Sequence, residues 1–315
     1  MTDVAIFHDR PYLSVLNFTE ALLAVIFQII SVTVMSSLLY CAATNAFQIR
    51  QFLSGALIIY MGTHLVFSIP AFPYFIYTIC NWRPVKNVED LYDANTLYVL
   101  GMHQLNYLTV APIPLLFLTL DRLFALKIPV KYKIWLSRWV RYMSIISIAA
   151  VFVASTVAIL TELPLRLDIV QECVVFSCIM IKSREYPQYL FRLIVESVNL
   201  LAASYLLLSM RTMSKFKTND LIIRQTLILD ICLNIIPTFF WSIFYAIAGE
   251  TPGNYYGQYP IMLGALDATC CSILYLITIW RKVRSPSKKK VNNFVTATSS
   301  THRISSNPLT VTARN

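Results

Sequence analysis

The sequence predicts an all-α membrane protein, a bundle of seven transmembrane helices. Of its 315 residues, 57% are hydrophobic and 13% are charged, whereas a soluble domain has roughly 45–50% apolar and about 25% charged residues. Seven long apolar runs follow one another along the chain, and about 20 such residues cross a bilayer as a helix. The runs are continuous, which argues against the alternating strands of a membrane barrel.

The first three runs lie at residues 19–43, 52–79 and 96–126. Residues 1–18 contain Asp3, Asp9 and Arg10 but no basic flank followed by an apolar core, so the first run is expected to act as the insertion signal. The third run is longer than a bilayer requires and should tilt or project beyond it. Within it, Pro112 and Pro114 are candidates for a kink.

The last four runs lie at residues 142–163, 189–210, 221–248 and 259–280. Pro237 is expected to kink the sixth run. Residues 281–315 are rich in Ser, Thr, Lys and Arg, so they should form a disordered basic tail that meets anionic lipid. The predicted organisation is an outer segment at residues 1–18, the helical bundle at 19–280 and this tail at 281–315.

The distribution of Lys and Arg predicts the orientation of the bundle. With the N-terminus outside, the inner segments contain 18 of these residues and the outer segments 6. Basic residues are in excess in cytoplasmic loops, so the split favours an outer N-terminus and a cytoplasmic C-terminus. The net charge of +10 is then explained by orientation and by attraction to membrane lipid, and no nucleic-acid partner is expected.

An acid and a base stand side by side at the inner end of the third run. Asp121 and Arg122 are followed by Ala125, Pro129 and Tyr132. We expect the carboxylate of Asp121 to hold Arg122 as a charge-assisted pair, and release of that pair to free the guanidinium for a partner protein. Pro129 is expected to end the helix and turn the loop. An ordinary charged pair that closes a helix is the alternative.

This spacing resembles the junction of the third helix and second inner loop of rhodopsin-like G-protein-coupled receptors. With the following Lys133, Ile134 and Trp135, it is most similar to nematode serpentine chemoreceptors of the Srg/Srv kind. The resemblance implies a receptor at the plasma membrane, with the sensory cilium as a candidate location and with a small-molecule ligand and a heterotrimeric G protein as partners. An arrestin or a kinase is a further candidate partner at the tail. The residues that it assigns to coupling are Asp121, Arg122, Pro129, Tyr132 and Tyr275.

The chain departs from the receptor pattern at several positions. The seventh helix keeps Tyr275 but lacks the Asn and Pro that precede this tyrosine in the family. The resemblance implies a disulfide to the second outer loop, for which Cys80 is the candidate on the bundle and Cys173 or Cys178 on the loop. Near Gln104, where amine receptors of this fold carry an Asp, there is no counter-ion for an ammonium group.

Polar residues inside the apolar runs predict a ligand pocket, because such residues are costly in a membrane and often functional. Arg192 and Glu196 are four residues apart, so they share a helix face and can neutralise each other. Asp230 and Asn234 are expected to belong to a polar activation or ion-linked network. Interhelical hydrogen bonding alone is the alternative. The ligand-binding candidates are His103, Gln104, Tyr107, Arg192, Glu196, Trp241, Tyr245 and Asp267.

Signs of an enzyme, a cofactor site, a glycosylation site and a transporter are few in the sequence. No nucleophile and base, and no metal ligands, stand at a usable spacing, so neither an enzyme nor a metal or other cofactor is expected. Asn17 lies in a glycosylation sequon that abuts the first run. The alternative function is a transporter or channel that uses the intramembrane acids as an ion path, for which paired repeats are expected but not visible.

Overall fold

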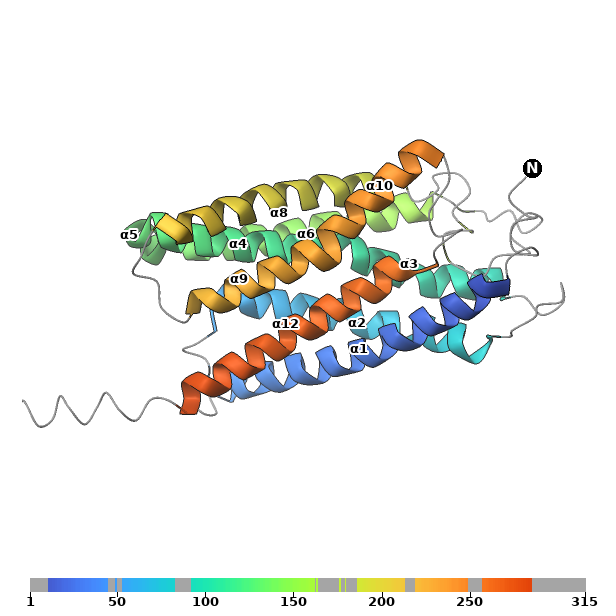
Figure 1. Cartoon of the computed structure of the whole chain (residues 1–315), viewed down its shortest axis with the longest axis horizontal. Coiled ribbons are helices and arrows are strands. Elements are labelled where there is room, and N and C mark those ends of the chain that lie inside the picture. Colours follow the sequence, from blue (N-terminus) through green and yellow to red (C-terminus); the bar gives the residue numbers. More distant parts are fainter. Residues whose placement is uncertain are drawn as a thin grey trace, which may run out of the picture.

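The computed structural model describes residues 11–44, 49, 53–82, 92–161, 163, 176, 179, 186–212, 219–248 and 257–284. Every regular element within these ranges is a helix, and the helices form one elongated bundle (Figure 1). The elements are α1 (Pro11–Ala43), α2 (Gly55–Cys80), α3 (Ala94–Val110), α4 (Pro112–Lys127), α5 (Pro129–Lys131), η4 (Tyr132–Leu136), α6 (Ser137–Leu160), α8 (Tyr186–Thr212), α9 (Asn219–Asp230), η6 (Ile231–Ile235), α10 (Ile236–Ala248) and α12 (Tyr259–Arg284).

Among the described residues, seven helical stretches are long and apolar enough to cross a membrane. The prediction of an all-α, multi-pass membrane architecture is therefore confirmed at the level of fold class. Several short elements join into single spans, because α3 continues into α4, α5 into α6, and α9 into α10. The stretches are Ser14–Ala43, Gly55–Cys80, Ala94–Lys127, Pro129–Leu160, Pro187–Met210, Arg224–Ile247 and Tyr259–Arg281.

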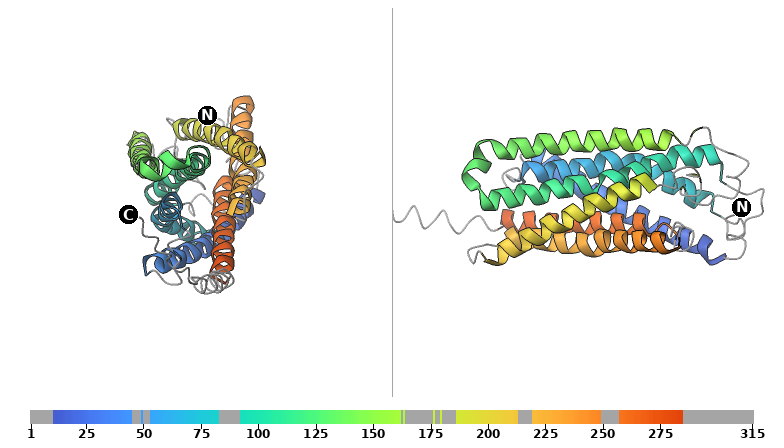
Figure 2. Two further views of the ribbon diagram at one scale, coloured as in Figure 1. Left: turned by 90° about the vertical axis from the view of Figure 1, so that its left-hand side faces the viewer. Right: turned by 90° about the horizontal axis from the view of Figure 1, so that it is seen from above.

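The span formed by α3 and α4 contacts helices on several sides of the bundle. α3 contacts α2 and α6, while α4 contacts α2, α6 and α8. α1 contacts α2 and α12, which brings the first and last helices together (Figures 1 and 2). Two large apolar clusters fill the interior. One includes Tyr74, Phe75 and Tyr98, and the other includes Met35, Met61 and Tyr275.

Large apolar side chains also cover the outside of the bundle. α6 exposes Tyr142, Ile145, Ile146, Val153 and Val157. A soluble monomer rarely exposes so continuous an apolar surface, whereas a helix that faces lipid is expected to do so. The outer surface of α6 therefore fits the hydrocarbon of a bilayer.

The sequence prediction is wrong about the region after Asp121. Pro129 does not turn a loop but begins the next helix, where its missing N–H is not needed. The chain breaks one residue earlier, at Ile128, whose φ of −136° and ψ of 61° are not helical. The fourth span consequently begins at Pro129 rather than near Tyr142.

Prolines coincide with irregular turns in two other spans. Ala111 separates α3 from α4, directly before Pro112 at the first position of α4. In the sixth span, the π-helical segment η6 (Ile231–Ile235) directly precedes Pro237, near the start of α10. Proline has no N–H to donate to the preceding turn, so a widened turn before it is a usual accommodation. Pro112 and Asn234, a residue of η6, both line one polar cavity.

Candidate functional site

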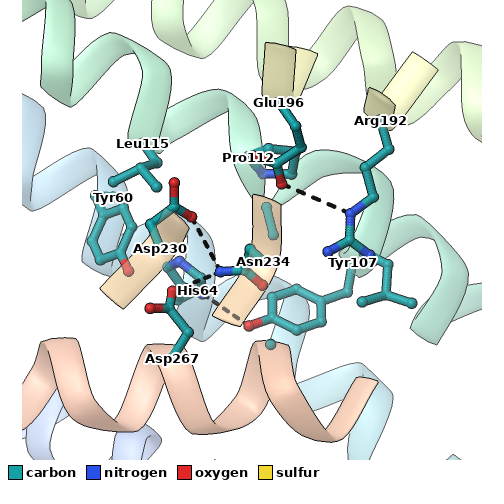
Figure 3. A pocket seen from close by; sticks show the side chains of 13 residues that line it. Tyr60, His64, Tyr107, Pro112, Leu115, Arg192, Glu196, Asp230, Asn234 and Asp267 are labelled. Atoms are coloured by element: carbon teal, nitrogen blue, oxygen red, sulfur yellow. Dashed lines mark hydrogen bonds and ion pairs between the residues drawn. The ribbon is translucent and has the colours of Figure 1, made fainter. Parts of the chain in front are cut away.

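A polar cavity of about 30 Å³ lies inside the bundle between α2, α3, α4, α8, α9, η6 and α12 (Figure 3). A cavity needs roughly 10–15 Å³ to hold one water molecule, so this one has room for a group of very few heavy atoms. Apolar side chains from α3 and α4 form one wall. The other lining residues are Tyr60, His64, Tyr107, Arg192, Glu196, Asp230, Asn234, Gly264 and Asp267.

Asn234 links two buried carboxylates across the cavity. Its Nδ2 donates to Asp230 Oδ1 over 3.1 Å and to Asp267 Oδ2 over 2.9 Å. Asn199 Nδ2 donates to the other oxygen of Asp230 over 3.0 Å, and Cys271 Sγ lies 3.6 Å from Asp267 Oδ1. These bonds join α8, the sixth span and α12. The expectation that Asp230 and Asn234 belong to one polar network is met.

Arg192 and Glu196 form the ion pair expected from their spacing. Arg192 Nε lies 3.8 Å from Glu196 Oε1, and both side chains are buried. The second carboxylate oxygen, Glu196 Oε2, is buried without a hydrogen-bond partner. The pair thus leaves an acceptor unused inside the cavity.

His64 and Tyr107, on α2 and α3, form a second polar contact at the cavity. His64 Nδ1 lies 2.9 Å from the hydroxyl of Tyr107, and the two rings meet edge to face. His64 Nε2 is buried and has no hydrogen-bond partner. The Tyr60 ring packs against the same imidazole, with centroids 4.4 Å apart. An aromatic surface therefore faces the acids.

The charges that line the cavity do not balance. Three carboxyl side chains, those of Glu196, Asp230 and Asp267, share the site with one guanidinium, that of Arg192. Like charges in a low-dielectric interior repel each other strongly, and buried charges normally have partners. The arrangement can therefore accept positive charge, either as protons on the acids or as a bound cation.

The structure brings together only some of the predicted ligand-binding residues. Tyr107, Arg192, Glu196 and Asp267 line the cavity. The other four candidates, His103, Gln104, Trp241 and Tyr245, are not among its lining residues.

Trp241 instead belongs to an aromatic group. It is buried, and its ring centroid lies 5.5 Å from that of Tyr189 and 5.3 Å from that of Tyr259. Gln104 is buried with its Oε1 unpartnered. Both residues contribute to the polar and aromatic interior outside the cavity.

Three polar residues of the site were not predicted from the sequence. Tyr60 and His64 lie one turn apart on α2, and Asn199 lies one turn after Glu196 on α8. The rule that selected the other candidates, a polar side chain inside an apolar span, applies equally to His64 and Asn199. It applies to Tyr60 as well, since the same rule selected two other tyrosines of the spans, Tyr107 and Tyr245.

At the other predicted site, Asp121 bonds to Tyr132. The hydroxyl of Tyr132 donates to Asp121 Oδ1 over 2.7 Å. Asp121 is buried, and its Oδ2 has no hydrogen-bond partner. The expectation of an Asp121–Arg122 pair is therefore not met in this conformation.

Arg122 reaches the start of α2 instead. Its Nη2 donates to the hydroxyl of Ser54 over 2.9 Å, and this hydroxyl also accepts from Leu57 N as the N-cap of α2. Adjacent residues point about 100° apart on a helix, so Asp121 and Arg122 are directed to different neighbours. Tyr275 lies in the apolar cluster nearby, with its ring 6.2 Å from that of Tyr60.

No protein-family model matches this chain, and no curated protein matches it at a significant level.

Two predicted modification sites have different outcomes. Cys80 is exposed at the end of α2 and has no disulfide partner among the described residues. Cys173 and Cys178 lie outside the described residues, so the disulfide stays a prediction.

The predicted glycosylation site has a different outcome. Asn17 lies within α1 at 8% exposure, and its Nδ2 atom is buried. This position argues against glycosylation there, because a glycan must be attached at Nδ2 and extend into solvent.

The start of α3 has a carboxylate cap outside the spans. Asp93 Oδ2 accepts from the Thr96 backbone N–H over 2.8 Å and from its hydroxyl over 2.6 Å. These bonds to the charged form lower the pKa of Asp93 below its ordinary value. Burial raises the pKa of the neighbouring Tyr92 to about 12, and its hydroxyl donates to the Thr78 carbonyl of α2. Together they fix the entry into the third span.

Proposed function

We propose that the chain is a G-protein-coupled chemosensory receptor of the plasma membrane. A small extracellular ligand would act at the polar cavity, and a heterotrimeric G protein would bind at the end of the bundle that contains Arg122. The ligand would favour the signalling state by binding it more tightly than the resting state. The seven-span architecture is compatible with this proposal, although it occurs in many membrane proteins.

The observation that carries the proposal is the paired restraint of Asp121 and Arg122. Tyr132 bonds the acid and Ser54 bonds the base. Each restraint comes from a different helix, α2 or the start of the fourth span, so relative movement of the spans would break them. A freed guanidinium could then donate to a partner protein.

The decisive experiment compares three forms at equal surface expression in cells that report G-protein activation. Arg122→Ala is expected to reduce coupling and to leave ligand binding intact, because the cavity is formed by other residues. The control is Arg138→Ala, an exposed arginine on α6. If Arg122→Ala signals like the parent, the proposed switch is wrong.

The proposed orientation has its own test. The 18-to-6 distribution of Lys and Arg supports an outer N-terminus and a cytoplasmic C-terminus. Tags at both ends, stained in intact cells, should be accessible only at the N-terminus. Staining of the C-terminal tag without permeabilisation would overturn both the orientation and the receptor proposal.

A second candidate is an ion transporter or channel. The gathering of Glu196, Asp230 and Asp267 in one intramembrane cavity favours it, because such acids often mark ion paths. Reconstituted protein would then move protons or cations across vesicles, and Asp230→Asn would stop the flux. A receptor without transport activity would show no flux above that of empty vesicles.

A further inference from the structure

We propose that the polar cavity binds a small primary ammonium group. This inference rests on the proposed function, because it names the chemical class of the ligand that was proposed to act at this cavity. The binding step does not depend on signalling, so it can be measured separately. The ligand would be ammonium itself or the protonated amine of a very small molecule.

The charge of the cavity favours a cation. One guanidinium neutralises one carboxylate at most, and two further acids remain near it. Asparagine bonds hold Asp230 and Asp267 in place without adding positive charge. Buried acids are stable when a counter-charge joins them, so a bound cation would supply what the lining residues lack.

Two residues that line the cavity from different helices each have an unused polar atom. Glu196 is 2% exposed and its Oε2 has no hydrogen-bond partner; His64 is 7% exposed and its Nε2 has none either. Such atoms cost free energy when buried unless a ligand or water bonds to them. Both residues line the cavity and lie around it in Figure 3. They are independent of the bonds that already hold Asp230 and Asp267.

The three acids of the cavity come from three separate helices. The N–H groups of an ammonium group donate over 2.7–3.2 Å to acceptors that lie in different directions, and the acids here come from α8, the sixth span and α12. Among the described residues, no three His, Cys, Asp or Glu side chains are gathered closely enough to hold a metal ion.

The rest of the lining agrees with this choice. The rings of Tyr60, His64 and Tyr107 border the cavity, and aromatic rings attract ammonium groups. The volume of about 30 Å³ limits the ligand to a few heavy atoms.

Two ligands with opposite charge test the proposal. The purified full-length chain in detergent is heated with methylammonium chloride, which is protonated at neutral pH, or with sodium acetate at equal ionic strength. A ligand that binds only the folded state raises the thermal midpoint as its concentration rises. Methylammonium is expected to raise the midpoint in a saturable way, whereas sodium acetate is not. If sodium acetate raises it as much as methylammonium, the proposal is overturned.

Charge-removing variants then locate the site. Glu196→Gln keeps the shape of the side chain and is expected to weaken methylammonium binding about 10- to 100-fold, the effect of losing one bond to a charged group. Arg192→Gln removes a repelling charge and should bind at least as tightly as the parent. The control is Glu20→Gln, which changes a buried glutamate of α1 outside the cavity and should leave the affinity unchanged.

The outcomes separate this proposal from the receptor proposal. Methylammonium binding that is lost in Arg192→Gln but kept in Glu196→Gln would overturn the inference, because it would not depend on the acid proposed to bind the cation. Saturable methylammonium binding that depends on Glu196 would support it even if no G protein is activated in cells. Conversely, G-protein activation by ligands that carry no amine, with no methylammonium binding, would overturn the ammonium site and leave the receptor proposal standing.

Discussion

The hydroxyl of Tyr132 donates to Asp121 Oδ1 over 2.7 Å, across the break at Ile128 that separates the third and fourth spans. This bond joins two successive helices at the end of the bundle where coupling is proposed. It also occupies one oxygen of a carboxylate that is only 1% exposed. A change of angle between the two helices would be resisted by this contact.

Replacement of Tyr132 by Phe should raise ligand-independent signalling. The substitution removes one hydrogen bond to a charged group, typically worth about 1.5–3 kcal/mol, and it keeps the ring. A shift of that size would change the population of the active state by about 10-fold or more. The measurement is basal G-protein activation at equal surface level, with the lipid-facing Tyr142→Phe as control. Unchanged basal activity would show that the bond does not restrain the switch.

Gly257→Ala should destabilise the protein markedly. Gly257 has a φ of 70°, which favours glycine, and an added Cβ would collide with Glu20 Oε2 and Asn17 Oδ1. Glu20 Oε2 accepts from the Gln258 backbone N–H, so the collision falls on the contact that joins α1 to the start of α12. A loss of about 1–3 kcal/mol is expected from the backbone strain alone.

The matched control for this substitution is Gly62→Ala. Gly62 lies inside α2, and apart from its chain neighbours and the nearby backbone of its own helix, no atom lies within 4 Å of an added Cβ. Alanine is the better helix former by about 0.5–1 kcal/mol, so this variant should be at least as stable as the parent. Both midpoints are read from thermal unfolding in detergent. Equal midpoints for the two variants would refute the role assigned to Gly257.

Asp93→Ala should weaken the start of α3 and remove a pH dependence. Loss of an N-cap carboxylate typically costs about 0.5–2 kcal/mol. Because its pKa is lowered in the folded protein, Asp93 stabilises the fold above the ordinary carboxyl pKa, and this contribution is lost as the pH falls through the lowered value. Thermal midpoints of parent and variant should therefore differ at pH 7 and converge in acid. Asp93→Asn, which retains an acceptor, should lose less at pH 7.

Cys80 is predicted to form a disulfide with Cys173 or Cys178. Peptide mapping of unreduced protein from the cell surface should find one of the two links. Cys80→Ser should then lower the thermal midpoint by removing a constraint on the unfolded chain, whereas Cys232→Ser, at an exposed position in the sixth span, should not. Recovery of Cys80 as a free thiol would contradict the prediction.

The spans were predictable from the sequence, but the contacts between them were not. Continuous apolar runs identified all seven spans, because length and hydropathy alone determine what crosses a bilayer. The helical start at Pro129 was missed because a proline was read as a helix end, although it suits the first turn of a helix equally well. Whether the chain breaks before or after such a proline depends on packing, here on the bond between Tyr132 and Asp121.

The candidate site was also predictable only in part, because most of its contacts are between spans. Arg192 and Glu196 pair within one helix, so their spacing was sufficient. Asp230, Asn234 and Asp267 meet across two helices, which depends on the rotation of each helix about its axis. A periodic pattern indicates the buried face but not which buried residue faces which partner. His64 was overlooked although the same rule for polar residues selects it.

The widened turn of η6 carries one residue more than an α-helical path of the same rise would hold. One extra residue rotates α9 relative to α10 by about 100° about the axis of the sixth span. The face of α9 that buries Leu227 against Ala203 and Leu206 of α8 is therefore set by this surplus as well as by its own sequence. Deletion of Cys232, exposed within η6, would cancel the surplus and turn a different stripe of α9 inward.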